Sequence, residues 1–313
     1  MTKLGFIGLG TMGASLASNL QKAGYDLVVH DVGRQVAERH IAAGATWAET
    51  PRALAEQSDV VLTSLPGPPE VEAVALDGEQ GLAAGLKPGS VYFDLSTSSP
   101  TLIRRIHAEF AEKGIHVLDA PVSGGPAGAK SGRLAVWVGG DEEVFKKYRA
   151  VLDAMGDQVR YIGPIGAGCI AKLTHNAAGY TIQCALAEVF TMGVKAGVEP
   201  LALWEAVRQG AQGRRRTFDG LAEHFLIDDY DPPAFAMRLG LKDISLATEL
   251  GREVGVPMRL VHMAKMEMSE AVNRGWGDRD SRISMLLQQE RAGVRIAVQP
   301  ERVRAVQDAD DGG

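Results

Sequence analysis

Apolar runs alternate with amphipathic segments along the first half of the chain. The runs predict β-strands over residues 4–8, 26–31, 60–65, 90–94, 116–120, 134–139 and 159–162. About ten or more helix-compatible residues separate most neighbouring runs, with predicted helices over 12–23 and 141–155. Connections of that length lead to a parallel neighbour, so we expect a mostly parallel, doubly wound α/β sheet with helices on both faces.

The second half of the chain has a helical pattern. Residues 166–196 are rich in alanine and contain no proline, which predicts one helix of roughly 45 Å. Further helices are expected over 200–209, 217–224, 238–254 and 261–274. We therefore expect an α/β domain over 1–164, a helical domain over 165–298, and a disordered tail over 299–313, where acidic residues and glycine end the chain.

Charge and composition narrow the possible partners. The formal net charge of −6 does not favour nucleic acid or an anionic membrane surface. No apolar run reaches the roughly 18 residues of a membrane span. Cys169 and Cys184 lack the spacing of a metal or disulfide motif, so we expect no metal site. Met1 lies just before the first strand, without an apolar leader, which predicts a cytoplasmic protein.

A glycine-rich turn follows the first predicted strand. Its sequence, Gly8-Leu9-Gly10-Thr11-Met12-Gly13, fits the GxGxxG pattern, whose glycines allow a tight turn and close approach to a pyrophosphate. The next helix would offer its N-terminal amides to that group. Asp31 ends the second predicted strand, where an acid hydrogen-bonds the cofactor ribose. Together these features predict a dinucleotide site.

The choice between NAD and NADP depends on two residues. Asp31 favours NAD, because its carboxylate would repel the extra phosphate of NADP. Arg34 follows three residues later and could bind that phosphate, so NADP stays an alternative.

Five motifs occur in order along the chain. The glycine-rich segment from Gly5 to Gly13 is followed by Asp94-Leu95-Ser96-Thr97, Asp119-Ala120-Pro121-Val122-Ser123-Gly124-Gly125-Pro126, Lys172-Leu173-Thr174-His175-Asn176 and Lys242-Asp243-Ile244-Ser245-Leu246-Ala247. In these segments the chain resembles the β-hydroxyacid dehydrogenase family, which includes 3-hydroxyisobutyrate dehydrogenase, tartronate semialdehyde reductase and the short glyoxylate reductases. The resemblance implies an N-terminal Rossmann domain, a long interdomain helix and an all-helical C-terminal domain.

Lys172 and Asn176 lie four residues apart in the long predicted helix, so both project from one face. A lysine buried in an apolar cleft has a lowered pKa and exchanges protons near neutral pH. The resemblance implies that Lys172 takes the substrate hydroxyl proton during oxidation and returns it during reduction. It also implies that Asn176 orients the substrate. A solvated helix lysine is the alternative.

Ser123, Gly124 and Gly125 follow a predicted strand. Two glycines free backbone amides to face an anion, and the serine hydroxyl adds a donor. The resemblance implies that this loop binds the substrate carboxylate. An ordinary glycine turn before the next strand is the alternative.

The resemblance assigns four further positions. Thr97, Leu65 and Pro66 would line the nicotinamide half of the cofactor, and Lys242 would approach both cofactor and substrate. Asp243 is expected to pair with Lys242 or to cap its helix.

Two features depart from the family pattern. His175 stands where the family often has asparagine, and we expect it to pack against the neighbouring domain, with a role as proton carrier or in tuning Lys172 as the alternative. Arg214-Arg215-Arg216 has no counterpart in the family motifs. We expect a solvated face or an oligomer contact there, and a clamp for a second anionic group of the substrate is the alternative.

These observations predict an NAD(P)-dependent oxidoreductase that reversibly oxidises a small anionic 3-hydroxy acid to its semialdehyde or keto acid. The alternatives are an NADPH-dependent reductase of small aldehydes, such as glyoxylate or succinic semialdehyde, and a non-catalytic cofactor-binding protein. Imine reduction is disfavoured by Lys172, which the imine-reducing relatives generally lack. The long apolar helix and the helix-rich second domain also predict a homodimer or homotetramer.

Overall fold

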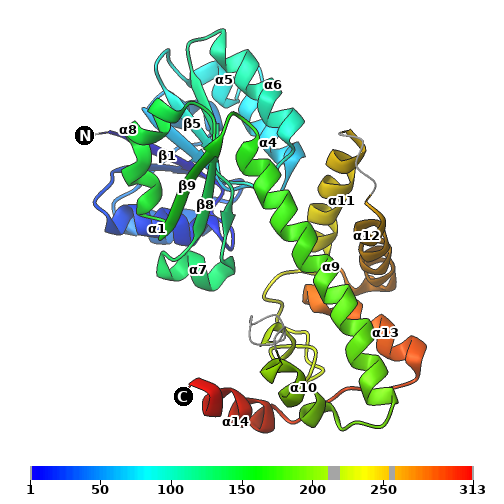
Figure 1. Cartoon of the computed structure of the whole chain (residues 1–313). Helices are drawn as coiled ribbons and strands as arrows, with labels where there is room; N and C mark the ends of the chain where they lie inside the picture. The colour runs from blue at the N-terminus through cyan, green and yellow to red at the C-terminus, as the bar shows by residue number, and fades with distance from the viewer. Residues whose placement is uncertain (1, 211–218, 254–257, 312–313) are drawn as a thin grey trace. The chain divides into compact units, whose positions relative to one another are not determined.

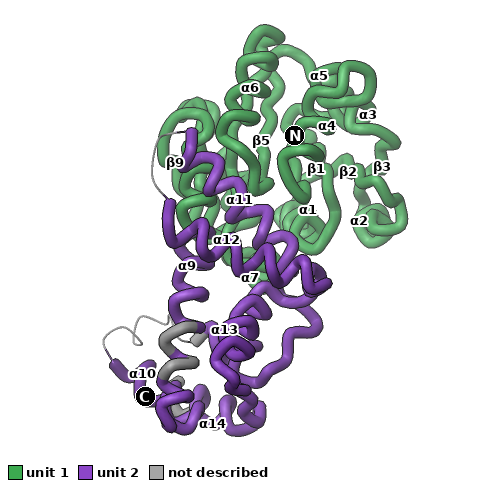
Figure 2. Tube along the Cα trace, turned by 90° about the vertical axis from the view of Figure 1, so that its right-hand side faces the viewer, with its two compact units in different colours: residues 1–175 green, residues 176–313 purple. Residues whose placement is uncertain are grey.

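The computed structural model describes residues 2–210, 219–253 and 258–311. The chain divides into two compact units, Met1–His175 and Asn176–Gly313, which Figure 2 shows in different colours. The boundary between these compact units falls inside one long helix, α9 (Ala167–Lys195), whereas the sequence places the domain boundary just before that helix, at residue 164. The difference arises because the first turns of α9 are hydrogen-bonded to the sheet of unit 1.

A nine-stranded sheet forms the centre of unit 1 in the described residues (Figure 1). The first six strands are parallel and lie in the order β3-β2-β1-β4-β5-β6. They are β1 (Leu4–Ile7), β2 (Leu27–His30), β3 (Thr46–Trp47), β4 (Val60–Thr63), β5 (Val91–Asp94) and β6 (His116–Asp119). The strand order reverses between β1 and β4, and open α/β sheets bind ligands at the carboxyl ends of strands beside such a reversal.

The sheet ends in a mixed region. Strand β8 (Ala135–Gly139) is antiparallel to β6 and to β7 (Val122–Ser123), and parallel to β9 (Gln158–Gly163). The sequence pattern missed β3 and β7, because each has only two residues and so shows no apolar run.

Helices cover both faces of the sheet and so bury the central strands on both sides. In β4, Val60 and Leu62 share a core cluster with residues of α1 (Gly13–Lys22), whereas Val61 belongs to the cluster of α6 (Pro100–Ala111). Each such aliphatic side chain contributes roughly 1.5–3 kcal/mol when fully buried. The other helices of unit 1 are η1 (Arg34–Ala37), α2 (Glu38–Ala42), α3 (Pro51–Ala55), α4 (Pro68–Leu76), α5 (Leu82–Gly85), α7 (Gly125–Ser131) and α8 (Glu142–Asp153).

The described residues of unit 2 form helices joined by turns and loops, without a named strand. After α9 come α10 (Pro200–Gln209), η3 (Asp219–Leu221), α11 (Met237–Glu253), α12 (Arg259–Ala271), the π-helical η4 (Val272–Trp276), η5 (Ser281–Ile283), α13 (Ser284–Ala292) and α14 (Pro300–Asp311). The helix predicted over 217–224 is represented only by η3 and turns, and residues 217 and 218 lie outside the described ranges. Arg214-Arg215-Arg216 lies outside them as well.

The predicted disordered tail is wrong for most of its length. Helix α14 covers Pro300–Asp311, and Val303 is 2% exposed in a core cluster with Trp204 and Phe225. Val306, three residues later on the same helical face, packs against that cluster. This apolar pair outweighs the acidic composition of the segment.

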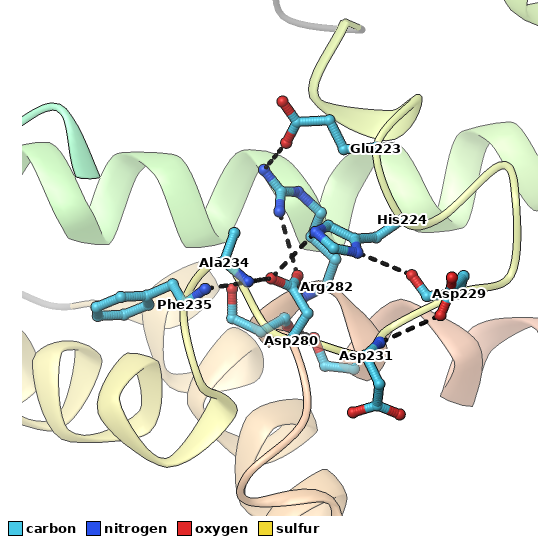
Figure 3. A network of polar contacts seen from close by, with 10 residues as sticks. Glu223, His224, Asp229, Asp231, Ala234, Phe235, Asp280 and Arg282 are labelled. Atoms are coloured by element: carbon cyan, nitrogen blue, oxygen red, sulfur yellow. Dashed lines mark hydrogen bonds and ion pairs between the residues drawn. The ribbon is translucent and has the colours of Figure 1, made fainter. Parts of the chain in front are cut away.

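A polar network joins two segments of unit 2, residues 223–235 and residues 280–282 (Figure 3). The buried Asp280 carboxylate accepts the backbone N–H groups of Ala234, Phe235 and Arg282 at 3.0, 3.3 and 3.0 Å. The Arg282 guanidinium donates to Asp280 at 3.2 Å, and His224 Nε2 lies 3.4 Å from the same carboxylate. The network fixes the chain that leads into α11.

Candidate active site

The turn after β1 contains two glycines that packing requires and one that it does not. A Cβ at Gly8, where φ is +92°, would lie 2.3 Å from the Ser64 carbonyl oxygen, and one at Gly13 would lie 1.8 Å from the Gly8 carbonyl oxygen. A Cβ at Gly10 would meet no atom within 4 Å. Met12, which precedes α1, gives the helix no side-chain cap. The open backbone at Gly10 beside an uncapped helix N-terminus therefore fits a dinucleotide pyrophosphate.

Asp31 joins the glycine-rich turn to the end of β2. Its Oδ2 accepts the N–H of Leu9 at 2.7 Å, and its Oδ1 accepts the N–H of Gly33 at 3.1 Å. Each carboxylate oxygen has a further lone pair. Asp31 therefore holds the turn in place and can still accept a ribose hydroxyl.

The positions expected near the nicotinamide lie at the ends of two neighbouring strands. Leu65 follows β4, and its N–H donates to Ser96 Oγ at 2.9 Å. The N–H of Ser96 donates to Asp94 Oδ1 at 3.0 Å, and burial of Asp94 raises its pKa to about 6. Pro66 and Thr97 are the next residues along these two loops. The buried Asp94 carboxylate thus holds Ser96, and Ser96 in turn holds the loop that contains Leu65.

The Ser123 loop connects a strand to a helix. Ser123 ends β7, and α7 begins at Gly125, so the loop is not a glycine turn before another strand. Gly124 has φ +140° and Gly125 has φ +63°, values that L side chains rarely adopt. Ser123 Oγ lies 3.2 Å from His175 Nε2, and the His175 ring lies against Trp137 at a centroid distance of 5.3 Å. Both of these His175 contacts are within unit 1.

Lys172 belongs to the same cluster. It is half-buried on α9 and lies one turn before His175 and Asn176. Partial burial lowers the pKa of His175, and the charge of Lys172 lowers it further. Unit 1 therefore brings Ser123, His175 and Lys172 together beside the carboxyl end of β6.

A second cluster lies in unit 2. Asn176 Nδ2 donates to Asp243 Oδ2 at 2.6 Å, and Lys242 Nζ lies 2.9 Å from Asp243 Oδ1. Asp243 is only 1% exposed. Burial, and then the charge of Asp243, raises the pKa of Tyr180 well above its usual value. The expected pairing of Lys242 with Asp243 is confirmed, and the same carboxylate also holds Asn176.

The sequence reasoning missed the buried polar groups beneath these side chains. Asp94 is the last residue of β5, Asp119 is the last residue of β6, and Tyr180 lies on α9 near Asp243. An acidic residue at the end of each of two apolar strands could have indicated them. A buried charge is costly unless polar partners surround it, so such an acid implies buried hydrogen-bond donors.

No group of His, Cys, Asp and Glu side chains in residues 2–210, 219–253 and 258–311 is arranged to hold a metal ion. In the same part of the chain, no helix combines the length and apolarity needed to cross a membrane.

Two family models match the sequence. Residues 3–163 match the NAD binding domain of 6-phosphogluconate dehydrogenase, and residues 166–287 match the NAD-binding model of NADP-dependent 3-hydroxyisobutyrate dehydrogenase. The chain belongs to the β-hydroxyacid dehydrogenase family. As a β-hydroxyacid dehydrogenase it is an NAD(P)-dependent oxidoreductase.

Several relatives of this β-hydroxyacid dehydrogenase match it along most of their length. It is 36% identical over 285 residues to the NAD-dependent L-serine dehydrogenase of Pseudomonas aeruginosa, which covers 90% of this chain and 95% of the relative. It is 35% identical over 295 residues to the 2-(hydroxymethyl)glutarate dehydrogenase of Eubacterium barkeri, covering 94% and 97%. The structure of Mycobacterium tuberculosis 3-hydroxyisobutyrate dehydrogenase with L-serine has a TM-score of 0.80 at 31% identity, covering 92% and 99%.

Proposed function

We propose that this enzyme reversibly oxidises a small anionic 3-hydroxy acid to its semialdehyde or keto acid, with NAD as the preferred cofactor. The observation that carries the proposal is the cluster of Lys172, His175 and Ser123 in a unit that also has a dinucleotide-binding turn. The relatives support the substrate class, because serine, 2-(hydroxymethyl)glutarate and 3-hydroxyisobutyrate all carry a hydroxyl group on the carbon β to a carboxylate.

The side chains have complementary roles in this reaction. Bound NAD supplies the acceptor for the hydride that leaves the carbinol carbon. The unprotonated Lys172 amine takes the hydroxyl proton as the C=O bond forms, and the ammonium returns it in the reverse direction. Ser123 and the backbone after it bind the carboxylate, and Asn176, held by Asp243, orients the substrate.

The preference for NAD is supported by the surroundings of Asp31 and Arg34. Asp31 is held beside the glycine-rich turn by Leu9 and Gly33. Arg34 pairs with Glu49 at 3.5 Å, so a 2′-phosphate would have to compete with that carboxylate. A kcat/KM for NADP more than about tenfold above that for NAD would reject this preference.

The test is absorbance at 340 nm with both cofactors against serine, threonate, glycerate, 3-hydroxyisobutyrate, 2-(hydroxymethyl)glutarate and a sulfonated 3-hydroxy acid. We expect turnover of at least one of them, and we expect Lys172→Ala to lower kcat by about a hundredfold or more while the Kd for NAD stays close to wild type. A Lys172→Ala enzyme that keeps more than about a tenth of wild-type kcat would reject the role of Lys172.

Arg34 keeps one alternative open. It is exposed, and a preference for NADPH would accompany reduction of small aldehydes. Running glyoxylate and succinic semialdehyde with NADPH in the same assay decides between the two activities. A cofactor-binding protein without chemistry would show no turnover in either direction.

We also propose a cytoplasmic homodimer or homotetramer. The buried thiol of Cys169 forms no disulfide, which is typical of a protein in a reducing compartment.

A further inference from the structure

Asp119 is a buried carboxylate that takes no part in the proton transfer described above. It ends β6 and is 0% exposed. Its Oδ1 accepts the N–H of Gly166 at 2.7 Å, and its Oδ2 accepts the N–H of Cys169 at 2.6 Å. These donors lie at the start of α9, where backbone N–H groups have no partner inside the helix. A carboxylate at this end also interacts favourably with the helix dipole.

Glycines on two elements leave room for the Asp119 carboxylate. A Cβ at Gly139 of β8 would lie 2.5 Å from Asp119 Oδ1. A Cβ at Gly168 of α9 would lie 2.9 Å from Asp119 Oδ2 and 2.3 Å from the Trp137 carbonyl oxygen. A side chain at either position would displace the carboxylate or the helix. The start of α9 therefore has one defined position on the sheet.

Asp119 connects the two segments of unit 1 that carry the reacting groups. Cys169 precedes Lys172 by three residues, or about one helical turn. On the other side, residues 120–122 lead from Asp119 to Ser123, which in turn contacts His175 of α9. The segment from Asp119 to Ser123 is therefore linked to α9 at both of its ends. Asp119 accepts two backbone N–H groups at the start of the helix, and Ser123 contacts His175.

We propose that Asp119 is a positioning residue that fixes the Lys172 amine relative to the Ser123 loop and so sets the rate of proton transfer. The proposal rests on the proposed function, in which Lys172 exchanges the substrate hydroxyl proton. A displacement of about 1 Å between reacting groups is enough to lower a rate by about a hundredfold. Loss of one of the two hydrogen bonds that Asp119 accepts at the start of α9 is therefore expected to lower kcat strongly. The folded state and the affinity for NAD should change little.

Asp119→Asn tests this, because asparagine keeps one oxygen acceptor but directs an NH2 group at the second backbone N–H. We expect amide hydrogen exchange over residues 166–175 to become at least about tenfold faster. With the substrate that wild type turns over, kcat should fall by about tenfold or more while the Kd for NAD changes less than about twofold. The solvent deuterium isotope effect on kcat should increase, because proton transfer becomes more rate-limiting.

The matched control is Asp280→Asn, which alters another buried carboxylate that accepts backbone N–H groups. This variant should keep the wild-type isotope effect. Unchanged exchange over 166–175 in Asp119→Asn would overturn the proposal. So would a kcat within about threefold of wild type, or a loss of kcat without a change in the isotope effect.

If wild type turns over none of the acids, the proposed function fails. The positioning role of Asp119 is then tested by a measurement that needs no substrate. Acetic anhydride modifies Lys172 in competition with the exposed Lys130, and mass spectrometry gives the ratio of the two rates. A change of about threefold or more in Asp119→Asn supports the positioning role, and an equal ratio in both proteins overturns it.

Discussion

The glycines of the glycine-rich turn are required for two different reasons. Packing of the chain excludes a side chain at two of them, whereas only a bound ligand would exclude one at the third. Side chains at Gly8 and Gly13 would collide with backbone, whereas Gly10 faces open space. The GxGxxG pattern identified all three positions, although two different physical reasons apply to them. The distinction can be tested with alanine.

We expect Gly10→Ala to keep wild-type thermal stability but to raise the Kd for NAD by about tenfold or more, because the added methyl group occupies the space of the pyrophosphate. Gly13→Ala is the comparison, and it should lower the melting temperature, since its Cβ would approach the Gly8 carbonyl oxygen. Thermal melts and calorimetric titration with NAD measure the two effects. Wild-type affinity in Gly10→Ala would show that the cofactor does not approach this residue.

His175 allows a second test on single residues. Partial burial and the charge of Lys172 keep its pKa below the usual 6.5, so the ring is neutral at pH 7.5. As the pH falls below that lowered pKa, the ring gains a positive charge beside Ser123. We expect KM for the hydroxy acid to decrease in wild type, relative to His175→Asn, as the pH is lowered from 7 through the pKa of His175. Parallel pH profiles of KM in the two enzymes would contradict this role.

The sequence could predict the parts of the site that lie in local motifs, but not the contacts between residues far apart along the chain. Lys172, Ser123 and the glycine-rich turn lie in local motifs, so they could be named from the sequence. The partners of the buried carboxylates could not, because Asp119 binds amides 47 and 50 positions away and Asp243 binds an amide 67 positions away. Those pairs depend on tertiary packing, which no local pattern records.

Among the secondary-structure elements, the buried parallel strands were the easiest to predict. Strands β4 and β5 are buried at every position, and this produces continuous apolar runs in the sequence. Helix α10 begins at the expected Pro200, where Glu199 accepts the N–H of Ala202 at 2.8 Å. The two-residue strands and α14 were missed, because short pairing and a single apolar pair are weak signals.

The ends of β4 and β5 carry a prediction about stability. Asp94 Oδ1 accepts from Thr63 and Ser96, while burial raises the pKa of the carboxyl group from 3.8 to about 6. The folded state then binds this proton more tightly than the unfolded state. Its stabilising contribution is therefore present at low pH and is lost as the pH rises through about 6.

The measurement is urea unfolding of wild type and Asp94→Asn at pH 4.5 and pH 7. Asparagine keeps the oxygen acceptor for both donors and does not titrate. We expect the unfolding free energy of wild type, relative to the variant, to fall by about 2 kcal/mol between the two pH values. A constant difference would mean that Asp94 titrates alike in the folded and unfolded chain.

For the whole molecule, the sequence predicts an α/β part and a helical part that divide at residue 164, whereas the compact units divide between His175 and Asn176. The boundary between His175 and Asn176 has no composition signal, because it lies within a continuous helix. Lys172 belongs to one unit and Asn176 to the other, although they are separated by a single helical turn.

Association of whole chains is predicted from α12. Leu260, Met263 and Met266 are 64%, 55% and 70% exposed on this helix, while Ala264 and Met268 lie in the core of unit 2. Gathered apolar side chains of this kind are typical of contacts with another molecule. We expect light scattering to give a mass that is a multiple of the 33.3 kDa chain.

The double variant Met263→Lys and Met266→Lys should lower that mass, because lysine preserves helix propensity but places charge in the contact. The control is Val198→Lys, which changes an exposed apolar residue outside α12. An unchanged mass in the double variant would assign association to another surface.

The open surroundings of Gly10 also bear on how the sequence drifts over generations. Selection for a stable fold retains Gly8 and Gly13 whether or not a dinucleotide binds, because the backbone itself excludes larger residues there. Only an occupied binding site keeps position 10 small. In a descendant that had lost its redox chemistry and survived as a scaffold, larger residues would therefore accumulate first at position 10, between two glycines that still persist.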